Sequence, residues 1–241
     1  MPTASGSAGP RPRSRSTWRF LRDVLVIFLA ALVLSFLVKT YLVRSFFIPS
    51  GSMEHTLEID DRVLVNELVP ALVPLHRGDV VVFADPGDWL GPLEAATPAT
   101  GPLDQILSFV GLGPDDGTGY LIKRVIGLPG DTVTCCNDFG QMSVDDVPLD
   151  EPYITVLPGE TRASRDDFTA TVPNDSLWVM GDNRYNSQDS RYNRDKPGEG
   201  FVPLDNVAGR AAVISWPLSR WTWLDNYPSV FAGTDSQDAT D

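Results

Sequence analysis

The hydrophobic pattern divides the chain into one long apolar run and several short ones. Residues 24–38 contain a single polar residue, Ser35, and the apolar character continues on both sides. A helix needs about 20 apolar residues to cross a bilayer, and Arg22 and Lys39 can reach the two interfaces with their long side chains. The pattern therefore predicts one transmembrane α-helix over residues 18–43.

The residues that precede this run predict its orientation. Five arginines lie within the first 22 residues, and no acidic residue occurs before Asp23. Positive charge beside an apolar run favours a cytoplasmic N-terminus, so we expect residues 1–17 to be a disordered basic cytoplasmic tail. A cleaved signal peptide would share the basic start and the apolar middle, but no A-x-A-like site follows the run. The pattern favours an uncleaved anchor.

Short β-branched runs separated by turn residues follow the anchor. They occupy residues 62–65, 79–83, 120–126, 176–180 and 207–216. Such runs are typical of strands, and no long segment with helical periodicity occurs outside the anchor. The pattern predicts an all-β domain over residues 44–220, outside the membrane.

Two further segments lack this pattern. Residues 85–119 are rich in Pro and Gly and read as a variable insertion between two strands. Its portion 103–113 is compatible with either a short helix or a loop that touches the membrane. We expect residues 221–241 to form a C-terminal tail, which becomes polar, acidic and disordered from Gly233 onward.

Charge and composition narrow the classes of function. The formal net charge is −13, which argues against nucleic acid as a partner because phosphate binding needs a basic surface. Two histidines and two cysteines are few for a transition-metal site. We expect no metal and no organic cofactor, and we interpret His55 and His76 as surface residues.

The two cysteines, Cys135 and Cys136, are adjacent. A disulfide between neighbours is strained because their α-carbons lie close together. Two thiols, a vicinal disulfide and pairing with other chains all remain open.

The first candidate catalytic residue, Ser52, lies in the stretch FFIPSGSMEHTL, just beyond the anchor. A serine such as Ser52 is a poor nucleophile without a base, and neither histidine stands in a triad pattern. The alternative base is a lysine whose pKa is lowered by burial. Strand alternation in YLIKRVIGLPGD places Lys123 on one face with Leu121 and Val125. Lys123 is therefore either a buried amine or an edge-strand lysine that faces water.

A third stretch, MGDNRYNSQDSR over residues 180–191, concentrates charged and amide side chains after a strand. It is either a polar loop held by its own turns and ion pairs or the wall of a site that orients a catalytic group.

The motifs IPSGSM, IKRVIGLPGD and GDNR-x-NS-x-DSR occur in this order behind the apolar run, and RGDVVVF, VPLDEPYI and FVPLDNVAGRA flank them. Over residues 20–217 the chain resembles bacterial type I signal peptidases. The resemblance implies a signal-peptidase-like β fold and a membrane-bound serine-lysine endopeptidase. Its partners would be membrane lipid and the signal peptides of secreted preproteins, which it would remove after small residues (A-x-A sites) at the outer face of the cytoplasmic membrane.

The resemblance also implies roles for individual residues. Ser52 matches the nucleophile, Lys123 the general base, and Ser187 the serine that hydrogen-bonds to the lysine amine and orients it. Ser50 and the Ser52 backbone N–H match the oxyanion hole. A supporting charge network would contain Asp182, Arg124, Asp189 and Arg191. A pocket for small substrate side chains would contain Phe46, Ile48 and Ile122. Tyr185 departs from the pattern, because GDNRDNS-type members carry an acid there.

Two rival interpretations remain. SOS-type self-cleaving repressor domains resemble this family in using a serine-lysine dyad, but they are soluble and linked to DNA. A surface protein that only binds a partner would require Ser52, Lys123 and Ser187 to be coincidental. Three tryptophans near the end of the chain are either interfacial anchors or ordinary core or surface aromatics: Trp216, Trp221 and Trp223.

Overall fold

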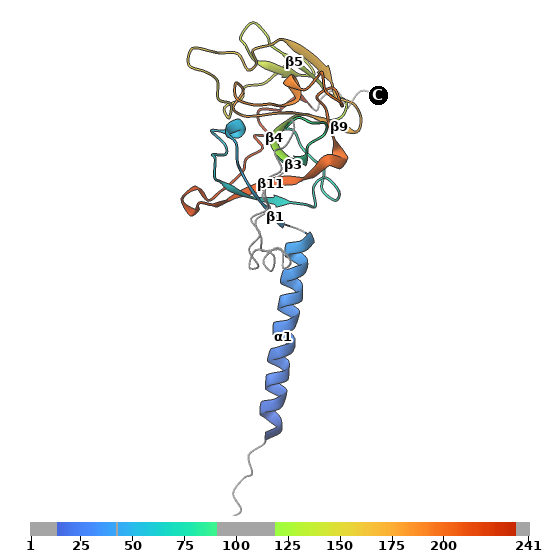
Figure 1. Ribbon diagram of the computed structural model, residues 1–241, viewed down its shortest axis with the longest axis vertical. Helices are drawn as coiled ribbons and strands as arrows, with labels where there is room; N and C mark the ends of the chain where they lie inside the picture. Colours follow the sequence, from blue (N-terminus) through green and yellow to red (C-terminus); the bar gives the residue numbers. More distant parts are fainter. Residues whose placement is uncertain (1–13, 42, 91–118, 235–241) are drawn as a thin grey trace, which may run out of the picture. The chain divides into compact units, whose positions relative to one another are not determined.

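The computed structural model describes residues 14–41, 43–90 and 119–234 (Figure 1). It divides into two compact units between Thr40 and Tyr41. Most of the expected insertion, including the segment 103–113, lies outside the described residues.

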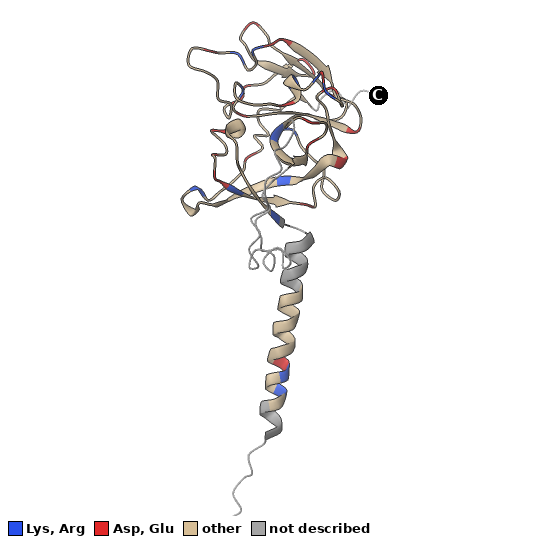
Figure 2. Cartoon of the chain, in the orientation of Figure 1, with Lys and Arg blue, Asp and Glu red and all other residues tan. Residues whose placement is uncertain are grey.

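The first unit contains helix α1 (Ser14–Tyr41), so the helix that the apolar run predicts is present. From Trp18 to Val33 its side chains are exposed on all sides. Figure 2 shows charged residues in the N-terminal part of the helix, where Arg22 pairs with Asp23, followed by an uncharged stretch. Over the described part of the chain, no helix combines the length and the apolar character needed to cross a membrane.

The second unit is built on an antiparallel sheet of eight strands in the order β1-β2-β11-β3-β4-β9-β10, with β12 paired to β11. Its strands are β1 (Val43–Phe47), β2 (Arg62–Asn66), β3 (Val80–Ala84), β4 (Tyr120–Gly127), β9 (Ser176–Met180), β10 (Val202–Pro203), β11 (Val207–Trp216) and β12 (Thr222–Trp223). The five runs predicted as strands correspond to β2, β3, β4, β9 and β11. The prediction of a mainly β domain is thereby confirmed.

A second antiparallel sheet has the order β7-β6-β5-β8. Its strands are β5 (Thr132–Cys135), β6 (Met142–Val144), β7 (Val147–Pro148) and β8 (Phe168–Thr171). In Figure 1 this sheet lies at the opposite end of the domain from β1 and β11. Its core packs on Trp178 of β9, whose ring lies 5.3 Å from that of Phe168. At the end of β5 a disulfide joins Cys135 and Cys136, which selects one of the three states left open by the sequence.

Four short 3-10 helices complete the described structure: η1 (Gly51–Met53), η2 (Ser190–Tyr192), η3 (Leu204–Asn206) and η4 (Leu218–Arg220).

The larger sheet curls so that two of its free edges face each other. The rings of Phe46 in β1 and Tyr120 in β4 lie 5.3 Å apart, although three strands separate β1 from β4 in the sheet order. Strand β1 pairs only with β2, and the register of β4 with β9 begins at Arg124. The outer edges of β1 and of residues 120–123 are therefore free of strand partners in the described part of the chain.

The expected C-terminal tail needs correction, because its described part packs on the domain. Strand β12 pairs with β11, and Phe231 and Thr234 are buried. The ring of Tyr227 lies 4.9 Å from that of Tyr153. Apolar side chains in this segment cover the second sheet, so residues 221–234 belong to the folded domain.

Candidate active site

Ser52 is placed by helix η1, a single buried turn that follows β1. Met53 is completely buried in the apolar core and anchors this turn. Asn183 holds the turn from the other side: its Nδ2 donates to Gly51 O at 3.2 Å, and its backbone N donates to Ser52 O at 3.1 Å. Both carbonyls are thereby bound, and Gly51 and Ser52 line the neighbouring cavity.

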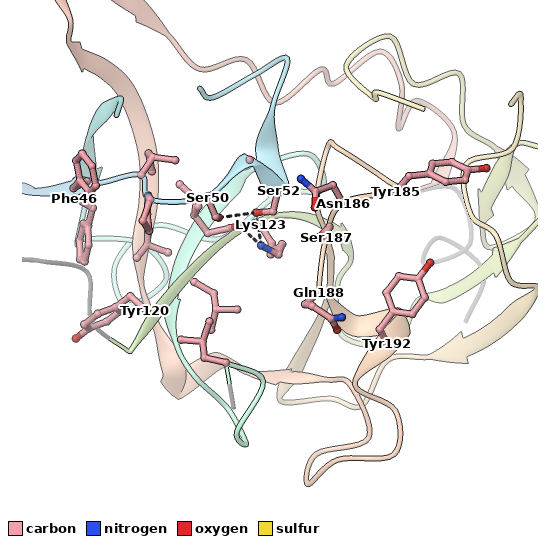
Figure 3. Close-up of a pocket in the computed structure, with 18 of the residues that line it drawn as sticks. Phe46, Ser50, Ser52, Tyr120, Lys123, Tyr185, Asn186, Ser187, Gln188 and Tyr192 are labelled. Atoms are coloured by element: carbon pink, nitrogen blue, oxygen red, sulfur yellow. Dashed lines mark hydrogen bonds between the residues drawn. The ribbon is translucent and has the colours of Figure 1, made fainter. Parts of the chain in front are cut away.

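Lys123 reaches Ser52 from the middle of β4. Its Nζ donates to Ser52 Oγ at 2.7 Å and to Ile122 O at 2.9 Å (Figure 3). Lys123 is 4% exposed and Ser52 is 6% exposed. The structure therefore selects the buried amine over the water-facing lysine.

The surroundings of Lys123 lower its basicity. Burial lowers the pKa of Lys123 from 10.5 to about 8, while the charges of Asp189 and Asp182 act in the opposite direction. Burial dominates because the ammonium form loses its hydration in the protein interior. A large fraction of the amine is then neutral near pH 8 and can accept a proton.

Two further predicted serines lie at the same cavity. Ser50 Oγ is 3.5 Å from Ser52 Oγ (Figure 3). Ser187 is buried and lines the cavity, and its hydroxyl helps to lower the pKa of the Asp189 carboxyl. The structure thus brings Ser187 to the cavity of Lys123 but shows no hydrogen bond between them. Ser187 Oγ lies against Gly181, where a Cβ would collide with it and with Ser52 O, so only glycine fits there.

The first part of the predicted charge network is a buried pair between Arg124 and Asp182. Arg124 Nε and Nη2 donate to the two carboxylate oxygens at 2.8 and 2.7 Å. Both side chains are fully buried. Thr56 Oγ1 adds a third bond to Asp182 at 2.5 Å, and Arg124 Nη1 donates to Gly78 O at 2.6 Å. This pair ties β4 to the loop after β9.

The second part joins Asp189 to Arg191. Arg191 Nε and Nη2 donate to the Asp189 carboxylate at 2.9 and 2.8 Å, and Gly181 N donates to it at 3.0 Å. Burial alone would raise the pKa of Asp189, but the charge of Arg191 and these hydrogen bonds hold it below its ordinary value. Asp189 is therefore an anion that faces the region of Lys123.

Sequence reasoning missed a third buried pair, between Arg184 and Glu151. Arg184 Nη1 and Nη2 donate to Glu151 at 2.8 and 2.5 Å, and Tyr153 OH donates to the same carboxylate at 2.8 Å. The two residues lie in the separate motifs GDNR and VPLDEPYI. The only sign of this pair in the sequence was that Glu151 and Arg184 lie in motifs that resemble the family and had been given no role. No spacing rule links positions so far apart in the chain.

A cavity of about 460 Å³ opens beside Ser52 and Lys123. On one side lies an apolar wall, formed by Phe46, Ile48, Tyr120 and Ile122. On the other lies a polar wall, formed by Arg165, Tyr185, Asn186, Gln188 and Tyr192. Figure 3 shows the labelled members of the two walls on opposite sides of Ser52 and Lys123. The three residues predicted for a substrate pocket all belong to the apolar wall.

The remaining candidates lie elsewhere. His55 and His76 are exposed, as expected for surface residues. In the described ranges, no cluster of three or more His, Cys, Asp or Glu residues could hold a metal ion.

Comparisons with known proteins agree with this geometry. The family model described as "Signal peptidase, peptidase S26" matches residues 21–216. The chain is 38% identical to "Signal peptidase I" of Mycobacterium tuberculosis (strain H37Rv) over 88% of its own length and 77% of that protein. It is 30% identical to "Signal peptidase I U" of Bacillus subtilis (strain 168), over 81% of its own length and 86% of that protein. The resemblance in the sequence motifs is confirmed, and the chain belongs to the signal peptidase family, peptidase S26.

Proposed function

We propose that this chain is a membrane-bound serine endopeptidase that removes N-terminal signal peptides from exported proteins after small residues. The observation that carries the proposal is the 2.7 Å contact between Lys123 Nζ and Ser52 Oγ in a buried site. It occurs in a chain whose relatives are named signal peptidase I. Ser52 and Lys123 would be the catalytic dyad.

The reaction follows from the positions of these two groups. The neutral Lys123 amine accepts the Ser52 proton as Oγ attacks the carbonyl carbon of the scissile bond. The resulting ammonium donates a proton to the departing amine, which leaves an acyl group on Ser52. Water then attacks this ester as the Lys123 amine takes its proton, and the ammonium returns a proton to Ser52 Oγ as the ester bond breaks, which restores the free serine and the neutral amine.

The neighbouring groups would stabilise the charges that form in these steps. The Ser52 backbone N–H and the Ser50 hydroxyl would donate to the oxyanion. Asp182 and Asp189 favour the ammonium form of Lys123, as their opposing effect on its pKa indicates. The buried hydroxyl of Ser187, at the same cavity as Lys123, is the group we assign to orient the amine. Arg124 and Arg191 would hold the two carboxylates in place.

An extended substrate fits between the free edges of β1 and β4, where it can add as a strand. Alternate side chains of a strand point the same way. The side chains of the first and third residues before the cut would then face Phe46, Ile48 and Ile122. These three side chains are already buried in the apolar core, which leaves room for small substrate side chains only.

We further propose that α1 is a single-pass anchor, with the N-terminus in the cytoplasm and the catalytic domain at the outer face of the membrane. The exposed apolar side chains of α1 and the arginines at its start support this placement. Membrane lipid would also contact the catalytic domain. Exposed Trp216, Trp221 and Trp223 near the β11–β12 turn support that contact.

The test is cleavage of an A-x-A precursor by the purified protein in detergent, with the cut site read by mass spectrometry. We expect cleavage after the second alanine. Leucine in place of either alanine should slow cleavage about 100-fold or more, because a branched side chain does not fit against the apolar wall.

Leucine at the middle position is the matched control, because its side chain points away from this wall, and we expect it to be tolerated. Equal cleavage rates for the original precursor and all three leucine variants would contradict the proposed pocket. A folded protein that cuts none of several precursors would contradict the proposed function.

A further inference from the structure

We propose that Arg165, stacked on Tyr185, binds an acidic side chain of the substrate in the segment that follows the cut. The inference rests on the proposed function and extends it to the leaving segment. It concerns substrate selection, so it adds no chemical step to the reaction.

The first observation is the placement of the catalytic pair between two walls of different chemistry (Figure 3). A peptide whose scissile bond lies at Ser52 must continue in both directions. Its residues before the cut occupy the apolar wall, which carries the free strand edges. The residues after the cut therefore leave over the polar wall, where Tyr185, Gln188 and Tyr192 lie.

The second observation is the charge around this cavity. Arg165 and Lys123 are the charged residues that line it, and no Asp or Glu lines it within the described part of the chain. Lys123 is buried and bonded to Ser52, whereas Arg165 is exposed. In a protein with a net charge of −13, Arg165 is thus the exposed cation among the described residues that line the cavity. Arg44 lies over the Phe46 and Tyr120 rings, on the side of the apolar wall.

The third observation is the way in which Arg165 is held. Its guanidinium carbon lies 4.9 Å from the centre of the Tyr185 ring, and Tyr185 OH donates to Arg162 O at 3.2 Å. Arg165 forms no ion pair with a carboxylate of the described residues. A guanidinium held over an aromatic ring, with no carboxylate partner, keeps N–H donors available for a carboxylate.

Nearby carboxylates limit the expected strength of this site. Asp167 is paired with Arg162, and Asp166 adjoins Arg165 in sequence. Burial, together with the charge of Glu160, raises the pKa of Tyr185. These negative charges reduce the local potential, so we expect a preference of modest size.

The identity of residue 185 is part of the inference. An acid at this position would put a negative charge near Arg165 and weaken the attraction of the guanidinium for a substrate carboxylate. Tyrosine supports the guanidinium without neutralising its charge. A change of Tyr185 to Asp should therefore remove the preference although Arg165 is still present.

The experiment uses the full-length protein in detergent and precursors that differ only at the first three residues after the cut. Each of these positions carries Glu, Gln or Lys in turn, and kcat/KM is measured for each. At one position we expect wild type to favour Glu over Gln by about 3-fold to 10-fold at low salt. This ratio should fall towards one at high salt.

Variants decide which residue is responsible. Arg165→Gln and Tyr185→Asp should each bring the Glu-to-Gln ratio close to one, and Arg165→Glu should favour Lys. Arg62→Gln is the control, because Arg62 is exposed on β2 and does not line the cavity, and it should keep the wild-type ratio.

Equal cleavage of the Glu, Gln and Lys precursors by wild type would overturn the inference, as would a preference that survives Arg165→Gln. Both results would leave the proposed peptidase intact. The absence of cleavage with every precursor would instead contradict the proposed function itself.

Discussion

Replacing Ser52 with alanine or Lys123 with methionine should lower kcat/KM for precursor cleavage about a thousandfold or more. The first change removes the hydroxyl that attacks the scissile carbonyl. The second removes the amine that takes the proton of this hydroxyl, which lies 2.7 Å away. Both changes replace a buried side chain with one of similar or smaller size, so the loss should be catalytic. The initial rates of the purified variants test this expectation.

Thermal unfolding and two surface variants serve as controls for this prediction. Lys123→Met should not lower the melting temperature, because it removes an amine whose ionised form is disfavoured by burial. Ser229→Ala and Lys196→Met alter a serine and a lysine outside the cavity and away from β1 and β4, and both should keep wild-type rates. If Lys123→Met retained the wild-type rate, Lys123 would not be the base.

Asp182→Ala should destabilise the domain by about 3–5 kcal/mol. This change leaves the Arg124 guanidinium fully buried without its carboxylate partner. The remaining hydrogen bonds of Arg124 go to uncharged oxygens, such as Gly78 O and Thr56 Oγ1, which do not neutralise its charge. Chemical denaturation of wild type and variant measures the change in the free energy of unfolding.

The matched control removes the acid of an exposed pair, Arg162 and Asp167. Here Asp167→Ala should cost less than about 1 kcal/mol, because water already screens and solvates both charges. If Asp182→Ala lowered the free energy of unfolding no more than Asp167→Ala does, the buried pair would contribute no more to stability than the exposed pair, and the prediction would be wrong.

The longer strands of the fold follow from local pattern. Strands β9 and β11 begin and end where the apolar runs do, and β2, β3 and β4 differ from their runs by one residue at most at either end. Strand β1 was missed because residues 43–47 (VRSFF) follow the expected anchor directly and show no apolar–polar alternation. Only pairing with β2, which is not encoded locally, distinguishes this strand from the helix.

The strands of the second sheet could not be predicted from the local sequence pattern, for a different reason. Its strands have two to four residues, such as β6 (Met142–Val144), and alternation cannot be recognised over so few positions. The packing of residues 221–234 likewise depends on partners far away in the sequence, such as Tyr153 for Tyr227.

The site could be predicted in part. Motif order identified Ser52 and Lys123, but strand alternation left the exposure of Lys123 open, because both faces of β4 are buried only once the whole domain is folded. The pairing of Arg184 with Glu151 depends entirely on the tertiary structure. The hydrogen bond expected from Ser187 to Lys123 is not present, and its role stays a prediction.

The most direct test of the account is the dependence of kcat/KM on pH between 6 and 10. The central claim is that neutral Lys123 is the base, and burial lowers its pKa to about 8. The neutral fraction then grows as the pH rises, so kcat/KM should increase about tenfold per pH unit below pH 8 and level off above it. A flat profile, a midpoint near 6.5 as for a histidine base, or one near 10.5 as for an unperturbed lysine would contradict the account.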